Sequence, residues 1–300
     1  MIRTRFLTAG TIFGAAVLLQ GCMNSDSTSG PDADPGTDEE GIQNVVLDED
    51  SDWADTDVRY FDADAGPSAA PINTHAWRRQ LTDFERDLNI VIDAPDGEVP
   101  TATVNATGRA IGLLHLWSCE TDDLVHYTKD WNDTAQRTMV LKKIRPTARP
   151  HRGWRLAETT GVLIQSDGTT RQINSVRIQA GDVDVTVDNV TDLIAREDVT
   201  RIPAGTEATI TVDTGDATDA VFVHVRKKGF RSELASNGDG TFSGSYMTGE
   251  RPGVRHLLVD VLSNGTLYDD TEAYDNLAWG IPYVLQTADG DDGEDDVSDE

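Results

Sequence analysis

Several common signatures of function are missing from the sequence. No apolar run of about 20 residues follows residue 22, which excludes a transmembrane helix from the rest of the chain. No Gly-x-Ser-x-Gly, His-Glu-x-x-His, phosphate-loop or Gly-x-Gly-x-x-Gly motif is present. Carboxylates are too numerous for an acid–base pair to be nominated from the sequence. We therefore expect a protein that is not an enzyme and that needs no cofactor.

Basic residues are scarce. The 300-residue chain has 25 Lys and Arg against 53 Asp and Glu, a formal net charge of −28. Such acidity excludes nucleic acid as a partner, because its phosphates would be repelled. Much of the excess lies in residues 24–64 and 289–300, which hold few apolar side chains. We expect these segments to be disordered, and we expect their removal to leave the melting temperature nearly unchanged.

The N-terminus carries a targeting pattern. Arg3 and Arg5 precede an apolar stretch, 6–19, that is too short to span a bilayer. It ends in Leu19-Gln20-Gly21-Cys22, which resembles the lipobox of bacterial lipoproteins. The resemblance implies cleavage before Cys22, a diacylglycerol and an acyl chain such as palmitate on that residue, and membrane anchoring through the lipid. Met23 in the next position implies the outer membrane.

Cysteine is the rarest residue type, with two copies. If Cys22 carries lipid, Cys119 has no partner and the chain has no internal disulfide. Cys119 follows His115 and Trp117 at strand spacing, with Asp122, Asp123 and His126 close behind in the sequence. A zinc site or a Cys–His pair could be built from these groups, but the spacing matches no established ligand pattern. Burial of Cys119 in a core is the favoured interpretation.

Composition and patterning predict a mainly β protein. We expect a signal peptide at 1–21, a lipidated cysteine with a disordered acidic tether at 22–71, a helix-plus-antiparallel-sheet domain at 72–180, an immunoglobulin-like β-sandwich at 181–286 and a disordered acidic tail at 287–300. The two folded domains are each near the usual domain size.

The first domain is predicted to begin with a helix. Thr74 can cap it, and an apolar stripe recurs at helical spacing in Trp77, Leu81, Phe84 and Leu88. Strands are predicted at 100–106, 110–118, 134–144, 154–165 and 170–179. Gly108 and the Asp-rich stretch 128–133 are interpreted as turns or loops. An all-β arrangement with a peripheral helix is the alternative.

The second domain alternates apolar and polar residues. Val183, Val185 and Val187 share one face, and the same period recurs around Ile210 and Val221. The run NGDGTFSGSY…GVRHLLVDV resembles bacterial immunoglobulin-like repeats, in which a Gly-Asp-Gly-Thr turn precedes a late strand. Over 181–286, this resemblance implies a β-sandwich used as a spacer or an adhesive module.

A cluster near the C-terminus is the main candidate binding site. It combines aromatic rings with carboxylates: Tyr268, Asp269, Asp270, Glu272, Tyr274, Asp275 and Trp279. Flat rings beside carboxylates suit a glycan, and clustered oxygens suit calcium, so the identity of any metal stays open. The alternative is that the rings pack between the two domains. A second candidate is the basic stretch 142–155, which could bind an anionic partner or be balanced by the protein's own acids.

These observations favour a membrane-anchored envelope lipoprotein with a non-catalytic binding or structural role. The expected partners are the membrane, through lipid on Cys22, and a polysaccharide or another envelope protein. One alternative is an envelope hydrolase that uses carboxylates of the first domain. The other is an accessory subunit that docks on another envelope protein through a flat apolar patch.

Overall fold

The computed structural model describes residues 36–47, 63–64, 74–120, 123–144, 150–225 and 230–287, all of which belong to one compact unit. The predicted signal peptide, Cys22 and nearly all of the predicted C-terminal tail lie outside these residues. Within the described ranges, no helix has the length and hydropathy needed to cross a membrane. The fold is mainly β, as predicted.

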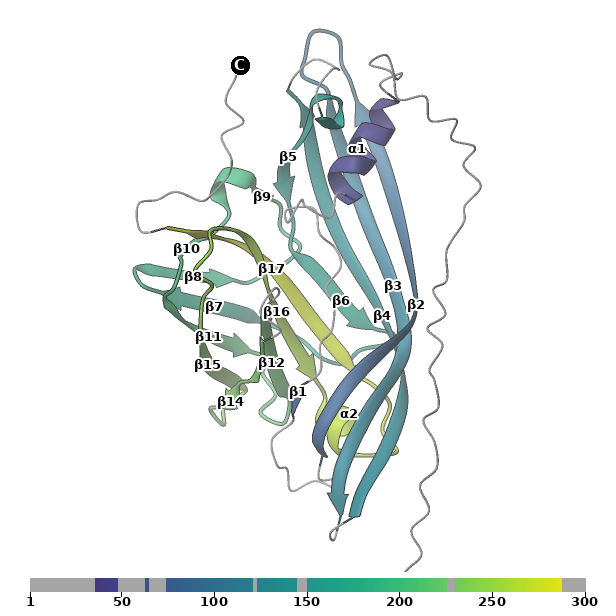
Figure 1. Cartoon of the computed structure of the whole chain (residues 1–300), viewed down its shortest axis with the longest axis vertical. Coiled ribbons are helices and arrows are strands. Elements are labelled where there is room, and N and C mark those ends of the chain that lie inside the picture. Colours follow the sequence, from purple (N-terminus) through teal and green to yellow (C-terminus); the bar gives the residue numbers. More distant parts are fainter. Residues whose placement is uncertain are drawn as a thin grey trace, which may run out of the picture. The chain divides into compact units, whose positions relative to one another are not determined.

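Two sheets carry the fold (Figure 1). The larger runs in the order β1 (Ala63–Asp64), β2 (Thr74–Asp93), β3 (Thr101–Glu120), β4 (Asp123–Lys143), β6 (Val162–Ser166), β17 (Asn276–Gln286), β16 (Gly253–Leu262), β12 (Ala220–Val225), β13 (Phe230–Glu233). Beside this path, β5 (Trp154–Thr159) pairs with β4 and β9 (Ile194–Ala195), and β10 (Arg201–Pro203) pairs with β17. The smaller sheet runs β14 (Ala235–Ser236), β15 (Thr241–Met247), β11 (Glu207–Asp213), β7 (Ser175–Ala180), β8 (Val183–Val187).

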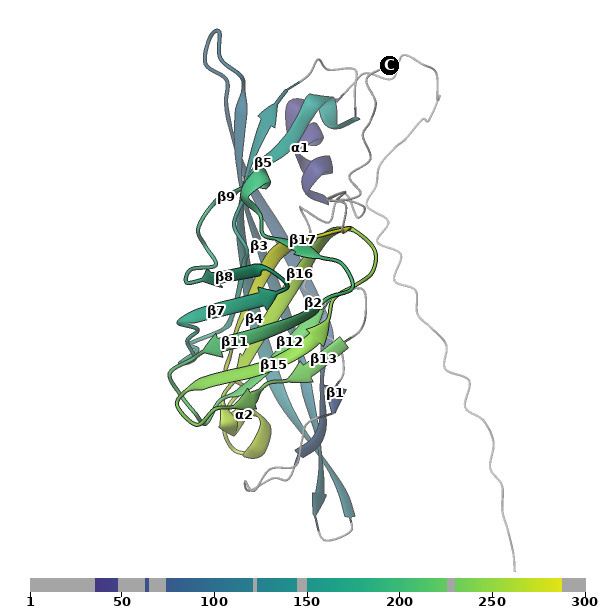
Figure 2. The same cartoon turned by 90° about the vertical axis from the view of Figure 1, so that its left-hand side faces the viewer.

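The smaller sheet packs face to face on β12, β16 and β17 and forms a sandwich (Figure 2). Inward residues of both layers share one core, including Ile178, Ile210, Val223, Val259 and Tyr283. The order β7-β11-β15-β14 on one layer and β17-β16-β12-β13 on the other is the immunoglobulin arrangement. The predicted period-two alternation is confirmed for β8 and β11, whereas β12 is buried on both faces because it lies between the sandwich core and the long strands β2, β3 and β4.

Three long strands extend the larger sheet beyond the sandwich. β2, β3 and β4 are 20, 20 and 21 residues long, and we call them the arm. β6 joins the arm to the sandwich, because it pairs with β4 on one side and with β17 on the other. The predicted domain boundary at 180/181 falls in the turn of the β7–β8 hairpin. It therefore separates no domains among the described residues.

The predicted helix after Thr74 is wrong, because these residues form β2 and pair with β3 along their length. The apolar stripe does not share a face: Trp77 is 1% exposed, whereas Leu81 is 55% and Phe84 is 39% exposed. A bulge between Leu81 and Asp83 shifts the register, so the period-two pattern changes phase within the strand. That phase change imitated a helical period.

The predicted breaks at Gly108 and 128–133 are also wrong. Gly108 lies opposite Ala135 within the β3–β4 ladder, and residues 128–133 pair with 110–115. The even-numbered polar residues of this stretch form the outward row of β4, whereas Lys129, Trp131 and Asp133 point inward and are buried. The strand expected after the Gly-Asp-Gly-Thr turn agrees with β15, which begins at Thr241.

A helix occurs instead inside the predicted acidic tether. α1 (Asp38–Leu47) begins with a capping box, in which Thr37 N donates to Glu40 Oε2 and Glu40 N donates to Thr37 Oγ1. Its apolar side chains Ile42, Val45 and Val46 are buried on the arm, in a core that includes Val104 and Trp154. The disordered-tether prediction is therefore wrong for α1, and removing residues 24–64 should destabilise the fold.

The helix supplies a direct test. Ile42→Ala should lower the free energy of unfolding by about 2–5 kcal/mol, because Ile42 is fully buried and its loss leaves a cavity. Leu47→Ala is the matched control, since Leu47 lies on the same helix but is 44% exposed. Urea unfolding of both variants and of the wild type provides the measurement. Equal midpoints for all three proteins would contradict the packing of α1.

Candidate functional site

A buried ion pair joins the arm to the sandwich. Arg79 of β2 donates to both oxygens of Asp260 on β16, at 2.7 and 3.1 Å, and both side chains are fully buried. The Arg79 guanidinium lies between the rings of Trp77 and Tyr274, 5.1 and 5.4 Å from their centroids. His224 Nε2 lies 3.2 Å from Asp260 Oδ2. This network sits inside the core and is closed to a large ligand.

Burial and the neighbouring charges together determine the protonation states of Asp260 and His224. Burial alone would raise the pKa of Asp260, but the charge of Arg79 and the hydrogen bonds from His224 and Arg79 outweigh it and hold that pKa well below its usual range. Burial lowers the pKa of His224, and the neighbouring Asp260 only partly opposes this effect. His224 is therefore neutral and donates to an ionised Asp260.

The aromatic residues of the C-terminal cluster are packed in cores. Trp279 belongs to the sandwich core, and Tyr268 and Tyr274 belong to the core between the arm and the sandwich. Tyr274 donates through its hydroxyl to Asp133 Oδ2 at 2.9 Å. These rings do not form one exposed surface, in agreement with the alternative that they pack between parts of the fold.

The carboxylates of the same cluster have separate roles. Asp275 accepts from Thr169, Thr170 and Arg171, which fastens this segment to the strand connection after β6. Asp269 accepts from the backbone N and the hydroxyl of Thr271. Asp270 and Glu272 are exposed to solvent. Across the ranges that the structure describes, no group of three or more His, Cys, Asp or Glu is arranged to hold a metal ion.

Lys129 holds the same segment from the arm. Its ammonium donates to the backbone oxygens of Gly265 and Asp269, at the two ends of α2 (Asn264–Tyr268). Burial lowers the pKa of Lys129 to about 8, although the neighbouring Asp269, Asp270 and Glu272 oppose the shift. The carboxylates predicted as calcium ligands therefore surround a lysine that belongs to the fold.

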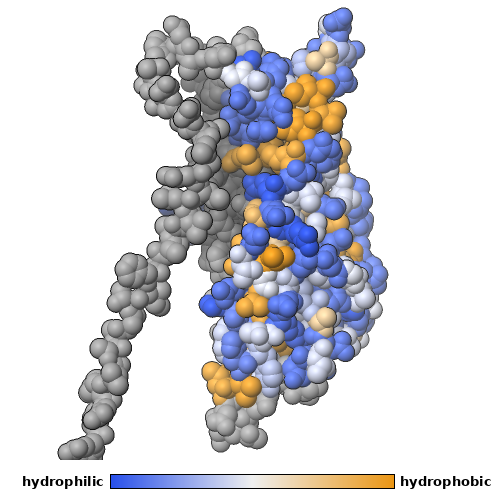
Figure 3. Space-filling model, turned by 90° about the vertical axis from the view of Figure 1, so that its right-hand side faces the viewer, coloured by the Kyte–Doolittle hydropathy of each residue, from blue (hydrophilic) through white to orange (hydrophobic). Residues whose placement is uncertain are grey.

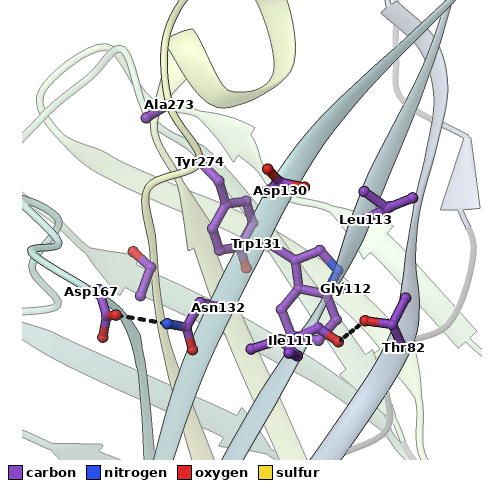
Figure 4. Close-up of a pocket in the computed structure, with 11 residues that line it drawn as sticks. Thr82, Ile111, Gly112, Leu113, Asp130, Trp131, Asn132, Asp167, Ala273 and Tyr274 are labelled. Carbon is purple, nitrogen blue, oxygen red and sulfur yellow. Dashed lines mark hydrogen bonds between the residues drawn. The ribbon is translucent and has the colours of Figure 1, made fainter.

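A hollow of about 530 Å³ lies where β4 passes beyond its last pair with β6 (Figure 4). The rings of Trp131 and Tyr274 lie beside each other there, with centroids 6.3 Å apart. Asn132 donates to Asp167 at 2.6 Å, and Asp130 supplies a second carboxylate. Gly112 lets β2 and the Trp131 ring pack closely on β3, because a Cβ there would lie 2.0 Å from the backbone oxygen of Gln80 and 2.7 Å from the indole nitrogen.

The exposed face of the arm carries a second arrangement, which we call the ring ladder: Arg78, Gln80, His115, Trp117, His126. The three rings are nearly parallel, with centroids 5.1 to 5.8 Å apart and interplanar angles of 9 to 19°. The Arg78 guanidinium lies 5.9 Å from the Trp117 ring centre. Its neighbours on this face include Leu113 and Asp130, which also line the hollow.

Hydrogen bonds orient the ladder. His115 Nε2 lies 2.8 Å from Gln80 Oε1, and His115 Nδ1 lies 2.9 Å from His126 Nε2. A neutral His115 satisfies both contacts when it donates to Gln80 and accepts from His126. The sequence indicated that His115 and Trp117 share a face, but the parts played by Arg78 and Gln80 depend on strand register. The side chains of Cys119 and Asp122, named for the zinc alternative, lie outside the described residues.

The basic stretch 142–155 is partly balanced by the protein's own acids. Asp38 at the start of α1 accepts from Lys143 at 2.7 Å and from Arg152 at 3.3 Å, and Lys142 faces Glu158 at 3.9 Å. Residues 145–149 lie outside the described ranges. The described part of this stretch therefore serves to dock α1.

Comparison of the chain with protein-family models, with curated proteins and with solved structures finds no match.

The buried His224 predicts a pH dependence of stability. Its pKa in the folded protein lies below the unfolded value of 6.5, so below pH 6.5 the unfolded chain binds a proton that the folded chain does not. Stability should fall as the pH drops, by at most about 1.4 kcal/mol per pH unit from this group. His224→Gln should flatten that part of the slope in urea unfolding, and His126→Gln, at an exposed position, should not. Identical slopes in the wild type and His224→Gln would refute the assignment.

Proposed function

We propose that this protein is a lipid-anchored, non-catalytic binding protein of the bacterial outer membrane that binds a glycan on the ring ladder. The N-terminal pattern ending in Cys22 supports the anchor. The single observation that supports the binding role is a set of parallel rings beside Arg78 and Gln80 on the solvent face of the arm, in which His126 is exposed and His115 and Trp117 are half-buried.

The positions of the anchor and the ladder along the arm suit this role. α1, which lies within the predicted tether, docks through Asp38 on Lys143, and the backbone N of Lys143 donates to the backbone oxygen of Pro100 at the β2–β3 turn. Trp117 lies at the opposite end of β3. Sixteen residues of strand separate Thr101 from Trp117, which corresponds to about 50 Å. A ligand bound at the ladder would be held well away from the anchored end.

The chemistry of the ladder suits a neutral or weakly acidic sugar. The flat rings offer an apolar surface for the C–H face of a sugar, and Gln80 and Arg78 offer polar groups for its hydroxyls. Asp130, Asn132 and Asp167 at the adjoining hollow add acceptors and an amide. Calcium is not proposed as a ligand, because the carboxylates of the C-terminal cluster do not converge. Asp269 accepts from Thr271, Asp275 accepts from Arg171, and the remaining two carboxylates are exposed.

The hydrolase alternative would use the hollow. Asp130 and Asp167 are the carboxylates that line it, beside Trp131 and Tyr274. Conversion of a bound glycan to shorter products, abolished by Asp130→Asn with Asp167→Asn, would favour that alternative.

The anchor is tested by Cys22→Ser. Without a thiol to carry the lipid, the protein should leave the membrane fraction and should no longer incorporate labelled palmitate. Met23→Ser keeps the cysteine and serves as the control, which should still be labelled. A Cys22→Ser protein that sediments with membranes and takes up palmitate would exclude the anchor.

Trp117→Ala tests the ladder. Trp117 stacks on both His115 and His126. Removing its ring should weaken glycan binding about tenfold or more, which corresponds to a loss of about 1.4 kcal/mol of binding free energy. Calorimetric titration with peptidoglycan fragments and a panel of polysaccharides is the measurement. Leu124→Ala is the control, because Leu124 is 67% exposed on the same arm and lies outside the ladder. If Trp117→Ala binds a glycan as tightly as the wild type does, the ring ladder is not the binding site.

A further inference from the structure

A group of exposed apolar side chains lies at the end of the arm where α1 begins. Its members are Val91, Ile92, Val99 and Ile144, which are 57%, 40%, 56% and 52% exposed, and we call them the tip patch. Val91 and Ile92 lie near the end of β2, Val99 lies in the turn between β2 and β3, and Ile144 is the first residue after β4. Figure 3 shows apolar residues gathered beneath the polar tip of the hairpin at the top of the view. Figure 2 shows the turn itself extending beyond α1.

The tip patch lies on both faces of the end of the arm. Val91 lies opposite the exposed Thr103 and belongs to the outward row, and Val99 is exposed in the turn between the two strands. Ile144 follows the outward row of β4, whose Lys142 lies opposite Thr101. Ile92 covers the opposite face of the same end. The patch therefore surrounds a narrow end of the sheet rather than forming a broad flat face.

We infer that the tip patch contacts the lipid surface to which Cys22 is anchored. The inference rests on the proposed function, because it requires an anchor at Cys22. About 14 residues connect Cys22 to Gly36, so the two are at most about 50 Å apart. Asp38, at the start of α1, is bound by Lys143, which itself pairs with the β2–β3 turn. The short connection thus leads directly to the patch.

A narrow apolar end suits a bilayer better than it suits a protein partner. A stable protein interface buries about 800 Å² on each side, whereas four partly exposed side chains around a turn offer a small, convex contact. A weak contact is sufficient here, because the anchor makes it intramolecular and gives it a high effective concentration. The turn also carries Asp93, Asp96 and Glu98, so zwitterionic headgroups should be preferred to anionic ones.

The contact can be measured with a fluorophore placed at each end of the arm. In a Cys119→Ser background, a polarity-sensitive dye is attached at Val99→Cys or, as the control, at Thr128→Cys on the exposed face near the ladder. The lipidated protein is reconstituted in phosphatidylcholine–phosphatidylethanolamine vesicles that contain a lipid quencher. The dye at position 99 should shift to the blue and be quenched several-fold more than the dye at position 128. Equal quenching at both positions would overturn the inference.

Charge substitution provides a second test of the contact. With the dye at Ile144→Cys, Val91→Asp with Val99→Asp should abolish the quenching, whereas Thr128→Asp should leave it unchanged. A quenching signal that survives Val91→Asp with Val99→Asp contradicts the inference. A blue shift that appears without vesicles and grows with protein concentration also contradicts the inference, because it would show that the tip patch binds a second copy of the chain.

The anchor and the contact can fail separately. If the native chain carries no lipid, a chain that begins at residue 23 and carries an N-terminal His-tag, and so has the dye cysteine as its single thiol, can be held on nickel-chelating lipid in the same vesicles, and the dyes can be read again. Quenching at position 99 in that sample would support the contact although the natural anchor had failed. No quenching in a sample with confirmed lipid at Cys22 would refute the contact alone.

Discussion

The ion pair between Arg79 and Asp260 fixes how the arm lies on the sandwich. Transfer of both charges out of water costs several kcal/mol per ion, and it is offset here by two short hydrogen bonds, a third from His224 and two aromatic faces. A shift of β2 by one residue would turn Arg79 to the outward face and leave the carboxylate of Asp260 buried without its guanidinium partner. Because alternate strand residues face opposite sides, Arg79 pointing inward requires its neighbours Arg78 and Gln80 to point outward, where they meet the ring ladder.

Much of the sandwich could be predicted from the sequence because its strands are short and bury one face. Alternating valines and the turn before Thr241 were sufficient to place the strands from 183 to 262. The arm was harder, because its strands are long and carry one bulge. The bulge at Leu81 produced a helical period, and the outward polar row of β4 resembled a loop. Apolar residues spaced by three or four positions cannot by themselves distinguish a helix from a strand in which a bulge reverses the faces of the side chains.

The candidate site required pairing information that a single sequence does not contain. His115 and Trp117 could be placed on one face, but only the β3–β4 register brings His126 opposite Trp117. The C-terminal rings resembled a sugar site because nothing local indicates that Trp279 lies at the centre of a sandwich. α1 was missed for another reason: acidic neighbours lowered the mean hydropathy around Ile42. The capping box at Thr37 and Glu40 was the local signal that could have revealed the helix.

The docking of α1 has a mechanical consequence. The chain passes from α1 to β2, which begins at the far end of the arm, so the helix folds the N-terminal segment back along the sheet. A pull between Cys22 and a ligand at the ladder would load the contacts of Ile42, Val45 and Asp38 before any strand hydrogen bond. Their release would add the chain from residue 36 to residue 62, up to the pairing of β1 with β2, which is about 90 Å of contour length. The arm would then be joined to its anchor beside the ladder itself, and tension would lengthen the connection while the sheet stayed folded.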